Sequence, residues 1–319
     1  MNNFAFVFPG QGSQAIGMLN GFAGNPVVEQ TVLEASEALG FDIGKLMAEG
    51  PKEELDLTTN TQPVMLTASV AVYRAWIAAG GAVPPVVAGH SVGEYAALVA
   101  AGVLQFKDAV PLVRFRAKVM QEVVPVGQGG MAVILGLGAD DVRALCAEAA
   151  TAEPGSVVEA VNFNEPTQIV IAGHTAAVER ACELAKAKGA KRAMKLAVSA
   201  PFHSSLLKPA AERLREYMQD ITFSAPQIAL INNVDVAILN DPAAIKDALA
   251  RQAAGAVRWV ETMQKLAEQG TTQVIESAPS KVLIGMAKRI DPRLAGEALV
   301  DQASLERVLA AMNAAPAAA

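Results

Sequence analysis

The chain has 319 residues, of which 52% are hydrophobic and 18% are charged, and its formal net charge is −6. This composition excludes a disordered chain, and it argues against a nucleic-acid-binding protein because the phosphate backbone selects for a basic surface. Charged residues or histidines interrupt the longest hydrophobic stretches well before the roughly 20 residues of a membrane-spanning helix. The N-terminal residues lack the basic segment and the long apolar run of a secretory signal. We therefore expect a globular protein with no membrane segment.

The two cysteines, Cys146 and Cys182, fit neither a metal-binding spacing nor a disulfide framework. Such cysteine usage is typical of the reducing cytoplasm, which we expect to be the compartment of this protein. The length fits two ordinary domains, or one large α/β domain that carries an insertion.

Hydrophobic runs that end at glycine-rich turns predict the strands of a parallel sheet. Residues Phe4–Phe8 run into the turn at 9–12, and Pro85–Ala88 run into the turn Gly89–Gly93 and then into a helix at Glu94–Val99. Strands followed directly by helices are typical of α/β folds, whose functional loops lie at the carboxyl ends of the strands.

The segment between residues 127 and 198 departs from this rhythm. Its pattern predicts the order βαββαβ, which is that of a ferredoxin-like unit. We expect this segment to be a subdomain inserted into a larger α/β domain made of residues 1–126 and 199–319. The elements predicted within it are strands at Met131–Leu137, Val157–Val161, Gln168–Ala172 and Arg192–Val198 and helices at Asp140–Ala150 and Thr175–Lys188.

After the insertion the α/β pattern resumes. The alanine-rich end, Ala314–Ala319, is expected to fray. The elements predicted here are helices at Lys208–Gln219, Asp241–Gln252, Val257–Glu268 and from Lys281 onward, and strands at Ile228–Ile231 and Gln273–Ile275.

The pattern Gly89-x-Ser91-x-Gly93 between a predicted strand and a predicted helix indicates a nucleophilic serine. In such an elbow the sharp turn exposes the hydroxyl, and the small flanking residues let neighbouring backbone pass closely. The helix N-terminus and the N–H of Val92 can then stabilise a developing oxyanion. The alternative is an ordinary strand-to-helix turn in which Ser91 only lies near the helix start.

A serine nucleophile needs a base, and the chain has three histidines. His90 adjoins Ser91 in sequence, so its side chain should diverge, and His174 precedes a predicted helix whose dipole disfavours imidazolium. This leaves His203, which follows the last strand of the insertion and so falls where a cleft between the two units is expected. The alternative is a packed or solvated loop histidine.

Two further features admit more than one interpretation. Residues Pro9–Ala15 match a dinucleotide fingerprint only superficially, because no second strand ending in an acid follows about 20 residues later. Arg114 and Arg116 lie in the predicted helix Val110–Met120. The simpler interpretation of either arginine is an exposed cation whose side chain extends along an amphipathic helix to solvent, with no role in binding.

Several separated motifs together resemble the malonyl-CoA:acyl carrier protein transacylases, which belong to the acyltransferases of fatty-acid and polyketide synthesis. The resemblance extends from Met1 to about Gln302, and it implies a hydrolase-like α/β domain with a ferredoxin-like insertion. The matching segments are Phe4–Gln14, Gly89–Glu94, Gln128–Met131, Asn162–Asn164, Ser199–Ser204, Asn232–Asp235 and Lys281–Leu283.

The resemblance implies a role for each matching residue. Ser91 would be the acylated nucleophile and His203 its base, with a carbonyl rather than a carboxylate orienting the histidine. The backbone N–H groups of Gln11 and Val92 would form the oxyanion hole. Around the substrate, the resemblance implies Arg116 as the partner of the malonyl carboxylate and Gln252 as the residue beside the histidine. We also expect substrate contacts from Asn162, which lies in a matching segment, and from Phe202, which precedes the base and should crowd the acyl α-carbon.

The same resemblance implies a ping-pong reaction from malonyl-CoA to the thiol of acyl carrier protein, with no metal and no redox cofactor. We expect a monomer. The alternatives are a malonyl-loading enzyme of a polyketide pathway, a serine thioesterase or esterase, and an inactive scaffold. A hydrolase of the related fold has its histidine late in the chain, whereas no histidine follows His203.

The chain departs from the family pattern in two loops. The segment Ser277–Ser280 replaces an expected Gly-Pro-Gly, so a turn that tolerates positive φ could be altered there. The residues 253–256, which follow Gln252, lack an expected proline. Neither change affects the nucleophile, the base or Arg116.

An acidic carrier protein would need a local basic patch on this acidic chain. The densest candidate surrounds the turn at 189–190, and a facing wall could come from Lys281, Lys288 and Arg289. The alternative is that these are solvated cations at helix ends, favoured there by the helix dipole. The predicted docking residues are Lys186, Lys188, Lys191 and Arg192.

Overall fold

The larger of two sheets is parallel and has the strand order β7-β2-β1-β8-β9. The computed structural model describes residues 3–198 and 200–314. The predicted strands of the large domain are present, and β9 is an addition. The strands are β1 (Phe4–Phe8), β2 (Val86–Gly89), β7 (Ala229–Ile231), β8 (Gln273–Glu276) and β9 (Ala295–Ala298).

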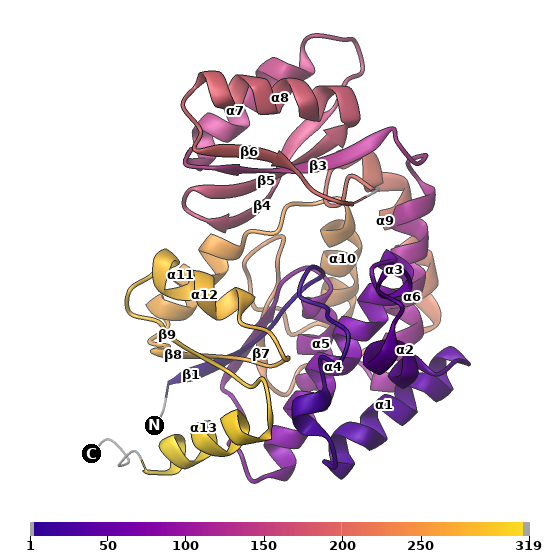
Figure 1. Ribbon diagram of the computed structural model, residues 1–319, viewed down its shortest axis with the longest axis vertical. Coiled ribbons are helices and arrows are strands. Elements are labelled where there is room, and N and C mark those ends of the chain that lie inside the picture. The colour runs from indigo at the N-terminus through magenta and orange to yellow at the C-terminus, as the bar shows by residue number, and fades with distance from the viewer. Residues whose placement is uncertain (1–2, 199, 315–319) are drawn as a thin grey trace.

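Helices cover both faces of this sheet (Figure 1). The helix predicted at 208–219 ends at Tyr217 and is followed by a separate 3-10 turn at Met218–Asp220. The helix predicted from Val257 begins two residues later, at Trp259. The helices of the larger unit are α1 (Pro26–Leu39), α2 (Ile43–Glu49), α3 (Lys52–Leu55), α4 (Thr58–Ala78), α5 (Gly93–Ala100), α6 (Phe106–Glu122), α9 (Lys208–Tyr217), α10 (Pro242–Ala253), α11 (Trp259–Glu268), α12 (Val282–Ile290) and α13 (Gln302–Ala314).

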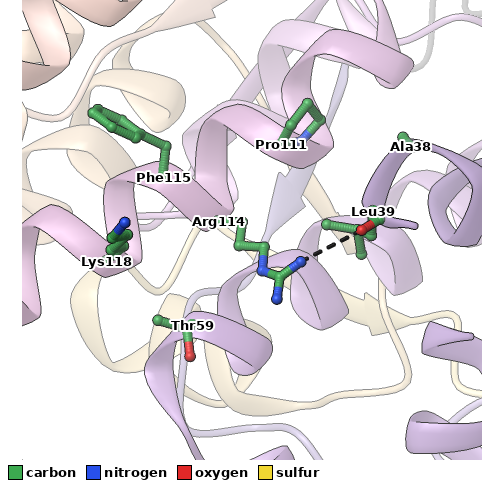
Figure 2. A pocket seen from close by; sticks show the side chains of 7 residues that line it. All are labelled: Ala38, Leu39, Thr59, Pro111, Arg114, Phe115 and Lys118. Atoms are coloured by element: carbon green, nitrogen blue, oxygen red, sulfur yellow. Dashed lines mark hydrogen bonds between the residues drawn. The ribbon is translucent and has the colours of Figure 1, made fainter. Parts of the chain in front are cut away.

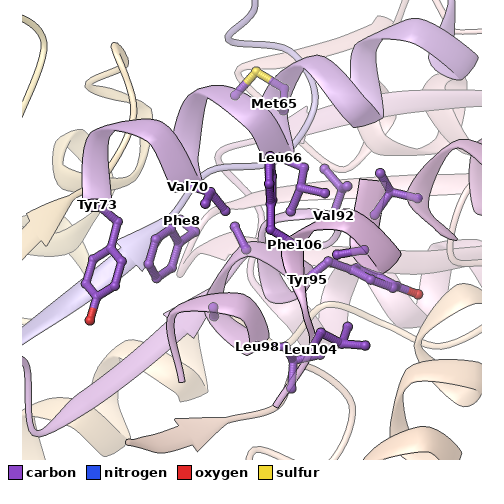
Figure 3. Close-up of a cluster of buried hydrophobic side chains, with 14 of the residues drawn as sticks. Phe8, Met65, Leu66, Val70, Tyr73, Val92, Tyr95, Leu98, Leu104 and Phe106 are labelled. Carbon is purple, nitrogen blue, oxygen red and sulfur yellow. The ribbon is translucent and has the colours of Figure 1, made fainter. Parts of the chain in front are cut away.

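Strand β1 is buried on both faces, and the side chains on one face are larger than those on the other. The rings of Phe6 and Phe8 pack into a core with α4, α5 and α6, whereas Ala5 and Val7 pack into a second core with α11 and α12. Figure 3 shows Phe8 beside Tyr73 of α4, and their ring centroids are 6.0 Å apart. The alternation of large and small side chains therefore fixes which helices lie on each face of the sheet.

The second sheet is antiparallel, with the strand order β4-β5-β3-β6. Helices α7 and α8 cover the face that points away from the larger unit (Figure 1). This confirms the predicted α/β fold with a βαββαβ subdomain, although β6 is shorter than expected. The elements are β3 (Gly129–Leu135), α7 (Ala139–Ala150), β4 (Val158–Glu165), β5 (Gln168–His174), α8 (Thr175–Ala187) and β6 (Arg192–Lys195).

The two units are joined along β4. The N–H of Val257 donates to Val161 O at 2.8 Å, and the N–H of Phe163 donates to Val257 O at 3.0 Å. The domain limits at 126/127 and 198/199 stay a prediction, and Ser199 lies outside the described residues, as do residues 315–319 of the expected frayed end. Within the described residues, no helix is both long and apolar enough to cross a membrane.

Candidate active site

Ser91 lies in a strained turn between β2 and α5, with a φ of 53°. Glycine is required on both sides: a Cβ at Gly89 would come within 2.1 Å of the Gly93 carbonyl carbon, and one at Gly93 within 2.0 Å of Phe8 O. The side chain of Asn233 holds the turn, since its Oδ1 accepts from Ser91 N at 2.8 Å and its Nδ2 donates to Gly89 O at 2.6 Å. The sharp turn predicted from the sequence is therefore present.

The imidazole of His203 lies against the Ser91 hydroxyl, with 2.7 Å between Nε2 and Oγ. Its Nδ1 lies 2.9 Å from the backbone oxygen of Gln252. Because a carbonyl oxygen can only accept, Nδ1 carries the proton and Nε2 is free to accept one from Ser91. Burial, followed by the positive charge of Arg116, lowers the pKa of His203 to about 3.

The other two histidines do not contact the serine hydroxyl. The Nε2 atom of His90 lies 2.8 Å from Asn164 Oδ1 of strand β4. The Nδ1 atom of His174 accepts from the N–H of Val157 at 3.1 Å within the smaller unit. Of the three histidines, His203 is therefore the one placed to act as a base toward Ser91.

The guanidinium of Arg116 is buried beside the serine and is held by neutral groups. Its Nη2 donates to Ser91 Oγ at 3.1 Å and to Gln252 Oε1 at 3.0 Å, and its Nη1 donates to Gln62 Oε1 at 2.7 Å. Burial lowers the pKa of Arg116. The described residues provide no salt-bridge partner for it, so an incoming carboxylate would compensate a buried charge.

Arg114 faces the opposite side of α6, as a separation of two residues requires on a helix. Figure 2 shows its side chain at a surface cavity of about 490 Å³, with Lys118 on the same helix. Its Nη1 donates to Leu39 O at 3.5 Å, and its guanidinium lies over the ring of Phe41. The exposed-cation interpretation therefore fits Arg114 and is wrong for Arg116.

The turn after β1 lies against the nucleophile turn, since a Cβ at Gly10 would be 2.8 Å from His90 O. Thr58 donates to the Gln11 side-chain oxygen at 2.8 Å. Neither the N–H of Gln11 nor that of Val92 donates a hydrogen bond to any of the described residues. These groups are therefore available to an oxyanion. The dinucleotide interpretation fails, because no helix starts at this turn and the first α-helix begins at Pro26.

The two remaining substrate residues have less defined surroundings. Phe202 is half-buried and packs against the large core and against the inner face of the second sheet, so it lies between the two units. Asn162 lies on β4, and its buried Oδ1 has no hydrogen-bond partner among the described residues. Asn164, also on β4, contacts the nucleophile turn through His90, and the substrate role of Asn162 stays a prediction.

Three polar residues of this site escaped the sequence analysis: Gln62, Glu94 and Asn233. The Oε2 atom of Glu94 accepts from Gln252 Nε2 at 2.9 Å and from Asn233 N at 3.1 Å. Glu94 and Asn233 lie within motifs that carried the family resemblance, and this was the available signal. Gln62 lies in none of the motifs, and the feature that distinguishes it is that it is a polar residue buried on α4.

The altered loop Ser277–Ser280 contains no strained residue, since the described non-glycine residues with positive φ are Ser91, His203 and Val236. Ser277 is buried, and its Oγ donates to Ser69 O at 3.0 Å. These residues therefore adopt no conformation that would need glycine, and an altered turn relative to the family pattern stays a prediction.

The family model described as "Acyl transferase domain" matches residues 5–302. The chain belongs to this acyl transferase family. This acyl transferase is 52% identical to a malonyl CoA-acyl carrier protein transacylase of Salmonella typhimurium, over 97% of this chain and 99% of the relative.

Solved structures of relatives share the fold of this acyl transferase. An acyl-carrier-protein S-malonyltransferase from Burkholderia pseudomallei is 64% identical, with a TM-score of 0.95 over 97% of this chain and 100% of that one. A malonyl-transacylase solved in complex with a type II PKS acyl-carrier protein is 51% identical, with a TM-score of 0.94 over 97% and 99% of the two chains.

Proposed function

We propose that this acyl transferase moves a malonyl group from malonyl-CoA to the phosphopantetheine thiol of acyl carrier protein, in fatty-acid biosynthesis. One observation carries the proposal: Ser91 Oγ contacts both His203 Nε2 and the buried guanidinium of Arg116. A nucleophile between a base and an unpaired cation suits an acyl group that ends in a carboxylate. The malonyl transacylases to which the chain is similar support the same substrates.

In the first half-reaction, His203 Nε2 takes the Ser91 proton while Oγ attacks the thioester carbonyl. The N–H groups of Gln11 and Val92 stabilise the oxyanion, and each such donor typically lowers the barrier by about 3 kcal/mol. The intermediate collapses with cleavage of the carbon–sulfur bond, and the proton on His203 passes to the CoA sulfur. The products are malonyl-Ser91 and CoA.

In the second half-reaction, the carrier-protein thiol gives its proton to His203 and attacks the Ser91 ester. The carbon–oxygen bond breaks, and the proton returns to Ser91 Oγ. A bidentate pair between Arg116 and the malonyl carboxylate holds the acyl group in one pose, which favours a positioned thiol over water. The proposed chemistry uses no metal and no redox cofactor, and the enzyme works as a monomer in the cytoplasm.

The decisive experiment is intact-mass measurement after mixing with malonyl-CoA. A malonyl adduct that is absent from Ser91→Ala and passes to added carrier protein supports the proposal. Rapid release of free malonate would indicate a serine hydrolase, and the absence of any reaction would indicate a scaffold.

Loading of a polyketide carrier protein is the second candidate function. It is favoured by the similarity to the transacylase solved with a type II PKS carrier protein. Rates measured with purified fatty-acid and polyketide carrier proteins as acceptors would separate the two functions.

Phe202 is proposed to crowd the space beside the acyl α-carbon, because it precedes the base and lies between the two units. Malonyl-CoA should then be preferred over methylmalonyl-CoA, and Phe202→Ser should reduce this preference. Competition between the two thioesters, followed by intact mass, measures the ratio. Phe202→Tyr keeps the ring and is the control. Equal use of both thioesters by the unchanged protein would refute this role.

The carrier protein is proposed to dock at Lys186, Lys188, Lys191 and Arg192, all of which are exposed. Lys188 Nζ lies 3.9 Å from Glu148 Oε2, and this exposed pair is weak enough to open for a partner. Lys188→Glu combined with Lys191→Glu should raise the KM for carrier protein and reduce its salt dependence, while loading of Ser91 stays unchanged.

The control for this charge reversal is Lys45→Glu combined with Lys107→Glu. Both lysines are exposed on the larger unit, so the control changes the net charge equally. If the two double variants have the same KM for carrier protein, the docking surface lies elsewhere.

A further inference from the structure

A buried carboxyl group that the proposed mechanism does not use follows the nucleophile by three residues, and its N–H donates to Ser91 O at 3.0 Å. Glu94 is in the first turn of α5, and only 2% of its surface is exposed. Burial raises its pKa to about 7, against the opposing effects of its hydrogen bonds to Gln252 and Asn233. A buried carboxyl group is costly unless its hydrogen bonds are made, so this position requires an explanation beyond core packing.

The contacts of Glu94 determine how Gln252 is oriented. Gln252 Nε2 donates to Glu94 Oε2 at 2.9 Å and to Ser91 O at 2.9 Å. Since both of these oxygens accept, the NH₂ group must face them, and this leaves Oε1 to accept from Arg116. A flipped amide would instead point its NH₂ group at the guanidinium.

Gln252 contacts both functional partners of the serine. Its side-chain oxygen holds Arg116 at 3.0 Å, and its backbone oxygen lies 2.9 Å from His203 Nδ1. No carboxylate is hydrogen-bonded to His203 among the described residues. Glu94 therefore contacts neither His203 nor Arg116 by a hydrogen bond, and Gln252 lies between it and both of them.

We propose that Glu94 is a positioning residue that acts through Gln252, fixing the pose of Arg116 and the orientation of His203. The same Glu94 oxygen accepts from the N–H of Asn233, whose side chain holds the turn at Ser91. One oxygen of Glu94 thus contacts both Asn233, which holds the turn at Ser91, and Gln252, which contacts His203 and Arg116. The inference rests on the proposed malonyl transfer.

Two conservative variants separate the reach of this side chain from its charge. Glu94→Gln keeps an acceptor oxygen at the same distance without the charge, whereas Glu94→Asp keeps the charge but withdraws the oxygen by one methylene. We expect Glu94→Gln to load Ser91 within about tenfold of the unchanged protein, and Glu94→Asp to lose about 100-fold, because misplacing a reacting group by about 1 Å can cost that much. The ratio of malonyl to acetyl loading should fall in Glu94→Asp alone.

A second measurement does not depend on malonyl transfer. The ¹⁵N chemical shifts of His203 report which ring nitrogen carries the proton, and we expect the Nδ1–H form in the unchanged protein and in Glu94→Gln. In Glu94→Asp both tautomers should appear. If the unchanged protein transfers no malonyl group, the proposed function fails, and these shifts still test the positioning role.

The matched control is Glu276→Gln, which alters another buried carboxyl group. Glu276 Oε2 accepts from the N–H groups of Leu283 and Ile284 at the start of α12, and it is not among the hydrogen-bond partners of Ser91, His203 or Arg116 in the described residues. Its replacement should lower the unfolding temperature without changing the malonyl-to-acetyl ratio. Equal losses in Glu94→Gln and Glu94→Asp, or an unchanged ratio and a single His203 tautomer in Glu94→Asp, would overturn the proposal.

Discussion

Arg116→Ala is expected to lower the rate of malonyl loading by about two to three orders of magnitude, while acetyl loading stays equal or becomes faster. The guanidinium is buried, so without it the malonyl carboxylate would be buried with no partner, which costs about 3–5 kcal/mol. A cost of about 1.4 kcal/mol corresponds to a tenfold change in rate. A neutral acetyl group does not need this partner. Single-turnover loading of Ser91 from each thioester, followed by intact mass, measures both rates.

Arg114→Ala is the matched control because it removes the same side chain from the same helix, two residues away. Arg114 is exposed and contacts Leu39 O and the Phe41 ring, so its loss should change neither loading rate by more than a few fold. Equal falls in malonyl and acetyl loading with Arg116→Ala would mean that Arg116 has a structural role, and the proposed substrate would lose its main support.

The sequence was informative where local chemistry decides the structure. The turn at Ser91 could be predicted because only glycine fits at positions 89 and 93, where a Cβ would overlap backbone atoms. The order of strands and helices followed from hydrophobic runs and turns, since each reflects contacts close in sequence. The fully hydrophobic run of β1 is typical of a parallel strand buried on both faces, and all five of its residues are buried.

Periodicity could have identified Arg116 without any family resemblance. On α6 it shares one face with Leu112, Val113, Val119 and Met120, all of which are buried. A cation at this position is not solvated, whereas Arg114 falls on the opposite face. The general rule that helix arginines extend to water gave the wrong answer, because it was applied without placing the two residues on the helix.

The supporting network could not be predicted, because its members are distant in the chain. Gln62, Glu94 and Gln252 meet only when α4, α5 and α10 pack around the same point. No local pattern encodes such a meeting. The tautomer of His203 depends likewise on a backbone oxygen 49 residues away, which carries no residue-type signal. Only the family resemblance implied that a carbonyl orients this histidine and that Gln252 lies beside it.

His203→Ala is expected to lower acetyl loading of Ser91 by about 10²- to 10⁴-fold, the usual contribution of a general base. The size of this loss should depend on pH in a way that tests the buried state of the imidazole. The residual rate of the variant should rise about tenfold per pH unit, because the serine must then ionise without a base. Acetyl-CoA is the substrate of choice, because it avoids titration of the malonyl carboxylate.

The pKa of His203, about 3 in the folded protein against an ordinary 6.5, sets the sign of this dependence. Because the buried imidazole stays neutral, the ratio of the unchanged protein's rate to that of His203→Ala should keep rising as the pH falls from about 8 to about 5. An ordinary histidine would become protonated below pH 6.5, both rates would then fall together, and the ratio would level off. Effects of other titrating groups, such as Glu94, occur in both proteins and cancel in the ratio. A plateau below pH 6.5 would therefore show that burial and Arg116 do not keep the base neutral, and a ratio independent of pH throughout would show that His203 is not the base.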